Sequence, residues 1–248
     1  MTTDRITNPL RLAKGSHQQG SGKGCAMNVI SYINGDAQIT DFPACSARPL
    51  AALVQSCNDL LARPDGYLLP EDSVLALDLG WQTVGTAKVP NPVIHAWIAE
   101  VLANPAWGVV RYAKLTAVKV IIDIAELHRR MASGDMPPIA AWDAADRAAR
   151  AAARAVSSSA NIAGRYALQA AYESTALVDT YDQAALDAVT GCAVRAHALA
   201  TGDSMENRVI QLTRHAIRSW RNFAGLDSAR RMEQAAVDDA ARLIGVPA

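Results

Sequence analysis

Four side chains in the first 45 residues are candidate metal ligands: His17, Cys25, Asp41 and Cys45. Thiolates, imidazoles and carboxylates bind zinc at about 2.0–2.3 Å, so these four would form a zinc site if their loops converged. Their spacings of 8, 16 and 4 residues match no standard zinc motif. The alternative is that both cysteines are small buried apolar residues and that His17 belongs to a loop. We prefer this alternative, so the sequence predicts no cofactor and keeps zinc as the less favoured interpretation.

Cys25 and His17 are also the candidate catalytic residues of this region. Cys25 follows a glycine at the N-terminus of an expected helix, where the helix dipole and free amides lower the pKa of a thiol and favour a nucleophilic thiolate. Inert cysteines are much commoner, and the chain contains no HExxH, no GxSxG and no helical ExxH pair. The glycine-rich stretch at 15–24 is not a Walker loop, because Ser21 stands where that motif has lysine. The sequence therefore favours a protein that is not an enzyme, without deciding the question.

Four arginines recur on an expected helix at residues 203–224: Arg208, Arg214, Arg218 and Arg221. A row of guanidinium groups fits a phosphate backbone, which makes nucleic acid a candidate partner. The alternative is a solvated helix face whose aliphatic stems cover the edge of the core and whose charges pair with nearby acidic side chains. We favour the alternative, because several acidic residues are near in the sequence and could pair with these arginines: Glu206, Asp227, Glu233, Asp238 and Asp239. The balance of 24 basic and 24 acidic residues also gives no sign of a nucleic-acid partner.

Helix signals follow one another along most of the chain. Of its 49 alanines, 22 fall in residues 141–200, where AAWDAADRAARAAARAV has the highest helix propensity in the sequence. Asn91-Pro92 and Asn104-Pro105 each place a capping side chain before a proline, and apolar residues at helical spacing follow both pairs. Expected helices begin near Cys25, Asp41, Asn91, Asn104, Ala140, Ser157, Asp182, Asp203 and Asp227.

Residues 73–86 are the ambiguous segment, since Gly80 and Gly85 argue against one continuous helix and leave room for a small hairpin. The expected fold class is mainly α, a multi-helix bundle or antiparallel helical array of about nine to ten helices. We expect residues 1–90, which hold the glycine and cysteine features, and the alanine-rich helical residues 91–248 to pack together as one unit.

The composition excludes several classes of protein. A chain of 248 residues that is 50% apolar and 19% charged is long enough for a hydrophobic core and too apolar to be disordered. We find neither the apolar run of a secretory signal nor an 18-residue apolar segment, so we expect no membrane association. Four cysteines without a secretory signal are typical of reduced thiols, and we expect a cytoplasmic location.

A set of residues in the N-terminal part forms a recognisable pattern: Leu12-Ala13, Gly15-Ser16-His17, Cys25, Met27, Tyr32, Gly35, Asp41, Pro43, Cys45, Asn58-Asp59, Leu68-Leu69 and Gly85-Thr86. In this pattern the chain resembles an uncharacterised family encoded by actinobacteria and their bacteriophages. The resemblance covers roughly the first 115 residues, and in this family an alanine-rich helical tail often follows. An acidic residue often follows the methionine in the family, whereas this chain has Asn28. The resemblance implies a bacterial or phage origin and a shared fold, without an activity.

These observations favour an intracellular helical protein that binds another macromolecule, for example as an accessory factor of bacterial or phage origin. We expect a protein partner or self-association, because helices lined with alanine pack closely within or between chains. Two alternatives remain. One is an enzyme or metal-binding protein that uses the thiol and histidine residues of the N-terminal region. The other is nucleic-acid binding through the Arg208–Arg221 helix face.

Overall fold

The computed structural model describes residues 11–17, 23–156, 161–178 and 182–227. Within these ranges the chain forms nine α-helices and one 3₁₀ helix, and no β-strand. The elements are α1 (Ala26–Asn34), α2 (Arg48–Leu61), α3 (Pro70–Gln82), α4 (Asn91–Ala103), η1 (Val109–Tyr112), α5 (Leu115–Ser133), α6 (Ile139–Val156), α7 (Ile162–Ser174), α8 (Gln183–Ala198) and α9 (Met205–Phe223). The expected mainly α, multi-helix fold is therefore confirmed.

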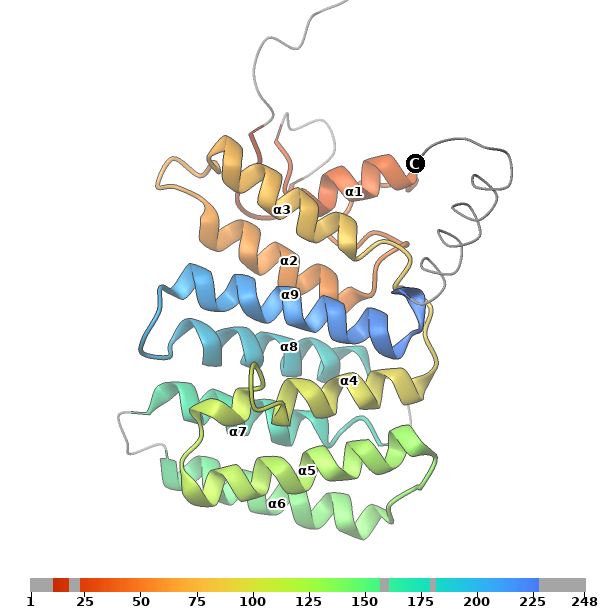
Figure 1. Ribbon diagram of the computed structural model, residues 1–248, viewed down its shortest axis with the longest axis vertical. Helices are drawn as coiled ribbons and strands as arrows, with labels where there is room; N and C mark the ends of the chain where they lie inside the picture. The colour runs from red at the N-terminus through yellow and green to blue at the C-terminus, as the bar shows by residue number, and fades with distance from the viewer. Residues whose placement is uncertain (1–10, 18–22, 157–160, 179–181, 228–248) are drawn as a thin grey trace, which may run out of the picture.

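The helices lie across the long axis of the molecule and stack along it (Figure 1). The first three helices form one end of the stack, and α5 and α6 form the other. Helix α9 lies in the middle of the stack, against α2, α4 and α8, although it is the last helix of the described chain. Helix α2 also packs on α8, so one hydrophobic core contains residues from both parts of the sequence.

Two tryptophans join α4 to α9 in this core. Trp97 is fully buried, its indole nitrogen donates to the Ala216 carbonyl at 2.9 Å, and its ring meets the edge of Trp220 at a centroid distance of 5.3 Å. Buried indoles contribute a large apolar area, and their N–H groups need an acceptor. The pair therefore fixes the last described helix against a helix more than 100 residues earlier.

The hairpin considered for residues 73–86 is wrong, because α3 runs continuously through Gly80. A Cβ atom at Gly80 would lie 3.1 Å from Cγ1 of Ile30 and 3.5 Å from the sulfur of Met27. The missing side chain thus lets α3 pack closely on α1, and this packing outweighs the low helix propensity of glycine. Gly85 follows the helix and has a φ of 80°, in the left-handed region that glycine adopts without steric cost.

Several helices begin elsewhere than expected. Helix α2 starts at Arg48 rather than near Asp41, and α5 starts at Leu115 rather than after Asn104. Asn104 ends α4 instead, and its side-chain oxygen accepts hydrogen bonds from the amides of Ala106 and Trp107. Helix α7 starts at Ile162 rather than near Ser157, because the Asn161 side chain caps it by accepting from the Gly164 amide. The helix expected after Asp227 lies outside the described residues.

Candidate functional site

The structure brings Cys25 and Asp41 together, two of the four proposed zinc ligands. Cys25 precedes the first residue of α1, and its thiol donates to Oδ1 of Asp41 at 3.3 Å. The same carboxylate accepts a hydrogen bond from Nδ2 of Asn28 at 2.9 Å and another from Nε2 of Gln55 at 3.1 Å. Asp41 is therefore the centre of a hydrogen-bonded cluster between α1 and α2, which we call the Asp41 cluster.

Cys25 in this cluster is a protonated thiol. Its side chain is fully buried, and burial, with a smaller contribution from the Asp41 carboxylate, raises its pKa to about 12. The lowered pKa expected at a helix N-terminus is wrong, because desolvation of the thiolate outweighs the favourable amides. A thiol in this state is a hydrogen-bond donor rather than a nucleophile.

His17 and Cys45 do not complete a metal site with this pair. The sulfur of Cys45 lies 3.7 Å from the Ser46 hydroxyl, and Nε2 of His17 is buried without a hydrogen-bond partner in the described ranges. Among the residues that the structure describes, no three side chains of histidine, cysteine, aspartate or glutamate are placed to hold a metal ion.

The expected arginine face is divided by the fold. Arg221 is 6% exposed, forms an ion pair with Asp227 at 2.9 Å and donates to the carbonyl of Gln82 at the end of α3. Arg214 is half-buried, and Arg218 is exposed. Arg221 thus holds α9 to α3 and faces the interior of the protein.

Arg208 is engaged at the other end of α9. Its guanidinium group donates to the carbonyls of His197 at 2.6 Å and Ala198 at 3.1 Å, and also to the carbonyl of Asp203. These carbonyls lie at and after the C-terminus of α8, where a cation is favoured by the helix dipole. The four arginines are therefore not one continuous binding face.

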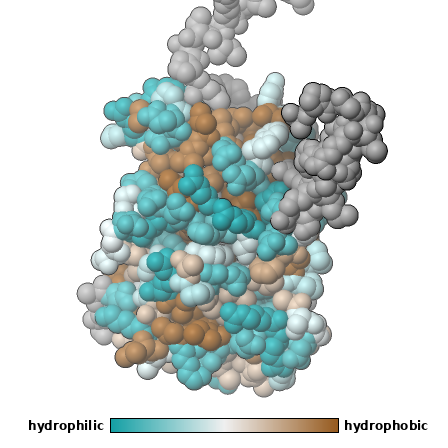
Figure 2. Space-filling model, in the orientation of Figure 1, coloured by the Kyte–Doolittle hydropathy of each residue, from teal (hydrophilic) through white to brown (hydrophobic). Residues whose placement is uncertain are grey.

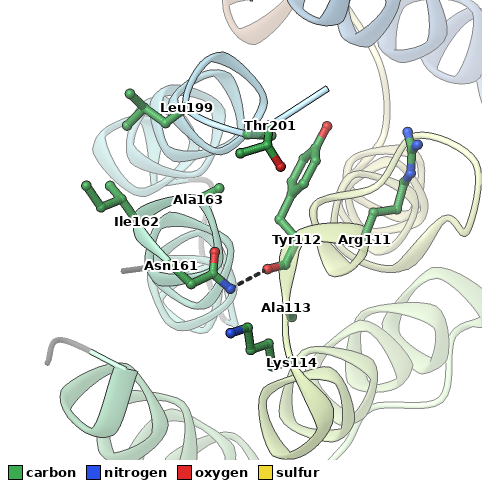
Figure 3. A pocket seen from close by; sticks show the side chains of 10 residues that line it. Arg111, Tyr112, Ala113, Lys114, Asn161, Ile162, Ala163, Leu199 and Thr201 are labelled. Atoms are coloured by element: carbon green, nitrogen blue, oxygen red, sulfur yellow. Dashed lines mark hydrogen bonds between the residues drawn. The ribbon is translucent and has the colours of Figure 1, made fainter. Parts of the chain in front are cut away.

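Two cavities of about 670 and 390 Å³ adjoin at η1, and both have Arg111, Tyr112 and Thr201 in their walls. We refer to them together as the η1 cleft. Figure 3 shows the larger cavity, which is lined by Tyr112 at the end of η1, Lys114 after η1, Asn161 before α7 and Thr201 after α8. The smaller cavity extends along the first turns of α9. Each volume is in the range of about 300–1,000 Å³ that is typical of small-molecule sites.

Asn161 and Gly164 hold one wall of the η1 cleft in place. The Asn161 side chain caps α7 by accepting from the Gly164 amide at 2.9 Å, and it donates to the Tyr112 carbonyl at 2.9 Å (Figure 3). A Cβ atom on Gly164 would lie 2.8 Å from that carbonyl oxygen and 2.5 Å from Nδ2 of Asn161. Glycine at position 164 is therefore required for η1 to lie against α7.

The charges that line the η1 cleft are mainly positive. Arg111, Lys114 and Arg208 line it, and Arg111 is exposed and donates to the Ala106 carbonyl at 2.7 Å. In the part of the chain described here, none of these three cations lies within ion-pair distance of a carboxylate. Asp203 is the acidic residue in the described walls. The cleft therefore offers two guanidinium groups and an ammonium group against one carboxylate.

Aromatic and imidazole rings form the floor of the smaller cavity. Trp107 stacks on His215 with an interplanar angle of 7° and a centroid distance of 6.1 Å. Tyr112 meets the buried ring of His197 edge-on at a centroid distance of 4.9 Å. The sequence contains no motif for this cleft, because its residues come from four separate segments. The local signal was Gly108, which interrupts the helix that we expected after Asn104.

Comparison of the chain with protein-family models, with curated proteins and with solved structures found no match. The resemblance to the actinobacterial and bacteriophage family therefore stays a prediction. Within the described ranges, none of the helices is long and apolar enough to span a membrane.

Proposed function

We propose that the protein binds its ligand through a phosphate or similar oxyanion group in the η1 cleft. The observation that carries this proposal is the set of three cations, Arg111, Lys114 and Arg208, which line adjoining cavities without pairing to a carboxylate. Guanidinium groups recognise phosphate through paired N–H donors, and an ammonium group acts as a point charge. The carbonyls bonded to Arg208 hold its guanidinium in place before a ligand arrives, which lowers the entropy cost of binding.

Titration calorimetry with inorganic phosphate and with sulfate tests the proposal on the full chain. We expect both anions to bind, and Arg111→Gln to weaken binding roughly tenfold or more, because a hydrogen bond to a charged group contributes about 1.5–3 kcal/mol. Arg218→Gln, which removes an exposed arginine outside the lining of the cleft, is the matched control. Equal affinity of the Arg111→Gln variant and the unchanged chain, or no binding at all, would contradict the proposal.

The phosphate group could belong to a small molecule or to a nucleic acid, and salt dependence separates the two sources. A nucleic acid that contacts several phosphates releases several counterions, so its affinity falls steeply with salt. A small phosphomonoester shows a shallow dependence. A steep slope with an oligonucleotide, lost in Arg111→Gln, would support the nucleic-acid alternative of the sequence analysis, with the η1 cleft rather than the Arg208–Arg221 row as its site.

Self-association is a second candidate function, and the apolar surface of α1 and α3 supports it. Tyr32 and Ile33 of α1 are 74% and 57% exposed, and Val74 and Trp81 of α3 are 68% and 52% exposed. Figure 2 shows hydrophobic residues gathered on the surface at this end of the molecule. Large exposed apolar patches are typical of interaction sites. We expect sedimentation to detect concentration-dependent association that Trp81→Ser weakens, and a monomer at every concentration would contradict this candidate.

The cellular location stays a proposal as well. The four cysteines of the chain are free thiols, three of them buried. Reduced cysteines fit the cytoplasmic location that the sequence predicts.

A further inference from the structure

His197 has an unusual hydrogen-bonding arrangement beside the η1 cleft. Its ring is 2% exposed, with Nδ1 2.9 Å from the Ala193 carbonyl oxygen and Nε2 2.9 Å from the Trp107 carbonyl oxygen. A neutral imidazole carries one N–H and donates to one of these oxygens, whereas an imidazolium donates to both. The backbone around His197 is therefore arranged for the protonated ring.

When no ligand is bound, the charges that face His197 oppose its protonation. Burial lowers the pKa of His197, the two carbonyl acceptors raise it, and the cations Arg111 and Arg208 lower it. Tyr112 contacts the ring with its edge, and Asp203 and His215 also line the smaller cavity. Two guanidinium groups against one carboxylate thus leave a positive surplus next to a ring that would itself become positive.

We propose that the η1 cleft binds a tetrahedral dianion, such as sulfate or a phosphomonoester, together with one proton that His197 takes up. This inference rests on the proposed function and adds the charge of the ligand and its coupling to pH. A dianion offsets the charges of Arg111 and Arg208, so the electrostatic cost of an imidazolium falls. The proton comes from solvent, adds to the unprotonated ring nitrogen and completes the second hydrogen bond to a carbonyl. No covalent bond forms between the protein and the ligand.

The proton uptake can be measured on the full chain without any substitution. Calorimetric titration with sulfate at pH 7, in two buffers of different ionisation enthalpy, gives the number of protons taken up per anion bound. Sulfate is the probe because phosphate itself titrates near neutral pH and would add its own protons. We expect an uptake approaching one proton, and an affinity for sulfate that falls about tenfold per pH unit once His197 must be protonated by binding.

Two variants test which histidine takes up the proton. His197→Gln should bind sulfate without proton uptake and with an affinity independent of pH between 6 and 8. His215→Gln, which removes the other imidazole that lines the cleft, should keep the uptake. If His197→Gln does not fold, ring ¹⁵N shifts of the unchanged chain answer the same question, because the His197 signals should move to imidazolium values when sulfate is added.

The outcomes separate this inference from the proposed function. Sulfate binding without proton uptake overturns the inference and leaves the proposed function standing. Uptake that persists in His197→Gln and is lost in His215→Gln also overturns it, since the proton then belongs to His215. Failure of sulfate and phosphate to bind overturns both.

Discussion

The Asp41 cluster and the η1 cleft are both polar regions of the molecule, and they differ in how their charges are compensated. In the Asp41 cluster one carboxylate receives donors from Cys25, Asn28 and Gln55, and the groups satisfy one another within the protein. In the η1 cleft, Arg111 and Lys114 line a cavity without a carboxylate partner among the described residues. The first arrangement stabilises the fold, and the second is free to bind an external charge.

Reactive residue types in a sequence do not by themselves locate a binding site. The Asp41 cluster contains Cys25 and Asp41, which the sequence identifies as candidate metal ligands, yet burial keeps the Cys25 thiol protonated. The η1 cleft is built from arginine, lysine, tyrosine and asparagine, residues that are common in any sequence. What distinguishes it is the lack of compensating charge in an open cavity.

Asp41→Ala should have the largest effect, and it should act on stability alone. The substitution leaves three donors without their acceptor, so we expect a loss of roughly 2–4 kcal/mol in the free energy of unfolding. Urea denaturation measures this loss. Asp123→Ala, which removes an exposed ion pair with Lys119 on α5, is the control and should cost less than about 1 kcal/mol. A marked loss of sulfate affinity in folded Asp41→Ala would break the distinction between the two regions.

Gly164→Ala should affect both stability and binding. The added methyl group collides with the Tyr112 carbonyl and the Asn161 side chain, which costs roughly 1–3 kcal/mol and displaces one wall of the η1 cleft. We expect weaker sulfate binding as well as easier unfolding. Gly191→Ala in α8 is the matched control, because a Cβ there has no neighbour within 4 Å, and it should stabilise the helix by up to about 1 kcal/mol. Full sulfate affinity in Gly164→Ala would show that this wall does not matter for binding.

The buried pair His95 and His128 is a third polar region, and it makes the stability of the protein depend on pH below neutrality. His95 and His128 share a hydrogen bond of 2.8 Å between their Nδ1 atoms, and Nε2 of His128 lies 3.0 Å from the Ser174 hydroxyl. Burial lowers the pKa of His95 and, together with His95, lowers the pKa of His128 well below its usual value. The unfolded chain therefore binds protons that the folded chain does not.

The stability that these neutral rings provide is present above about pH 6.5 and is lost as the pH falls below it, by at most about 1.4 kcal/mol per pH unit for each proton. Urea denaturation at pH 7 and pH 5.5 should show this decrease. His128→Gln should reduce the pH dependence, and an unchanged dependence would mean that other groups cause it.

The smallest effect concerns the thiols. Burial raises the pKa of Cys25 to about 12 and the pKa values of Cys57 and Cys192 to about 11, whereas Cys45 is only half-buried. At pH 8 we expect a thiol reagent to modify Cys45 first and the other three slowly, and Cys45→Ser to remove the fast phase. Rapid modification of Cys25 would contradict its place in a closed cluster.

The same raised pKa values of Cys25, Cys57 and Cys192 contribute to a loss of stability at alkaline pH. A group with a raised pKa in the folded state provides stability that is complete below its unfolded pKa of about 9 and declines as the pH rises toward the folded value. Denaturation should therefore become easier above pH 9.

Most of the helices could be predicted from the sequence, because helix signals are local. The helices expected to begin near Cys25 and Asp182 are α1 and α8, and the Asp182 side chain caps α8. The prediction was wrong where the same local residues are compatible with two different structures. Asn104-Pro105 ends one helix instead of beginning the next, and Gly80 serves packing against α1 rather than breaking α3.

Which side chains meet, and which are buried, depends on how the helices pack against one another. Cys25 and Asp41 were both identified, but periodicity does not reveal that burial would keep the thiol protonated. Arg208 and Arg221 lie on one helix as expected but form no common face. Arg208 donates to the His197 carbonyl near the end of α8, and Arg221 donates to the Gln82 carbonyl at the end of α3. The η1 cleft joins segments up to about 100 residues apart, and such contacts depend on the packing of whole helices, which no local pattern in the sequence encodes.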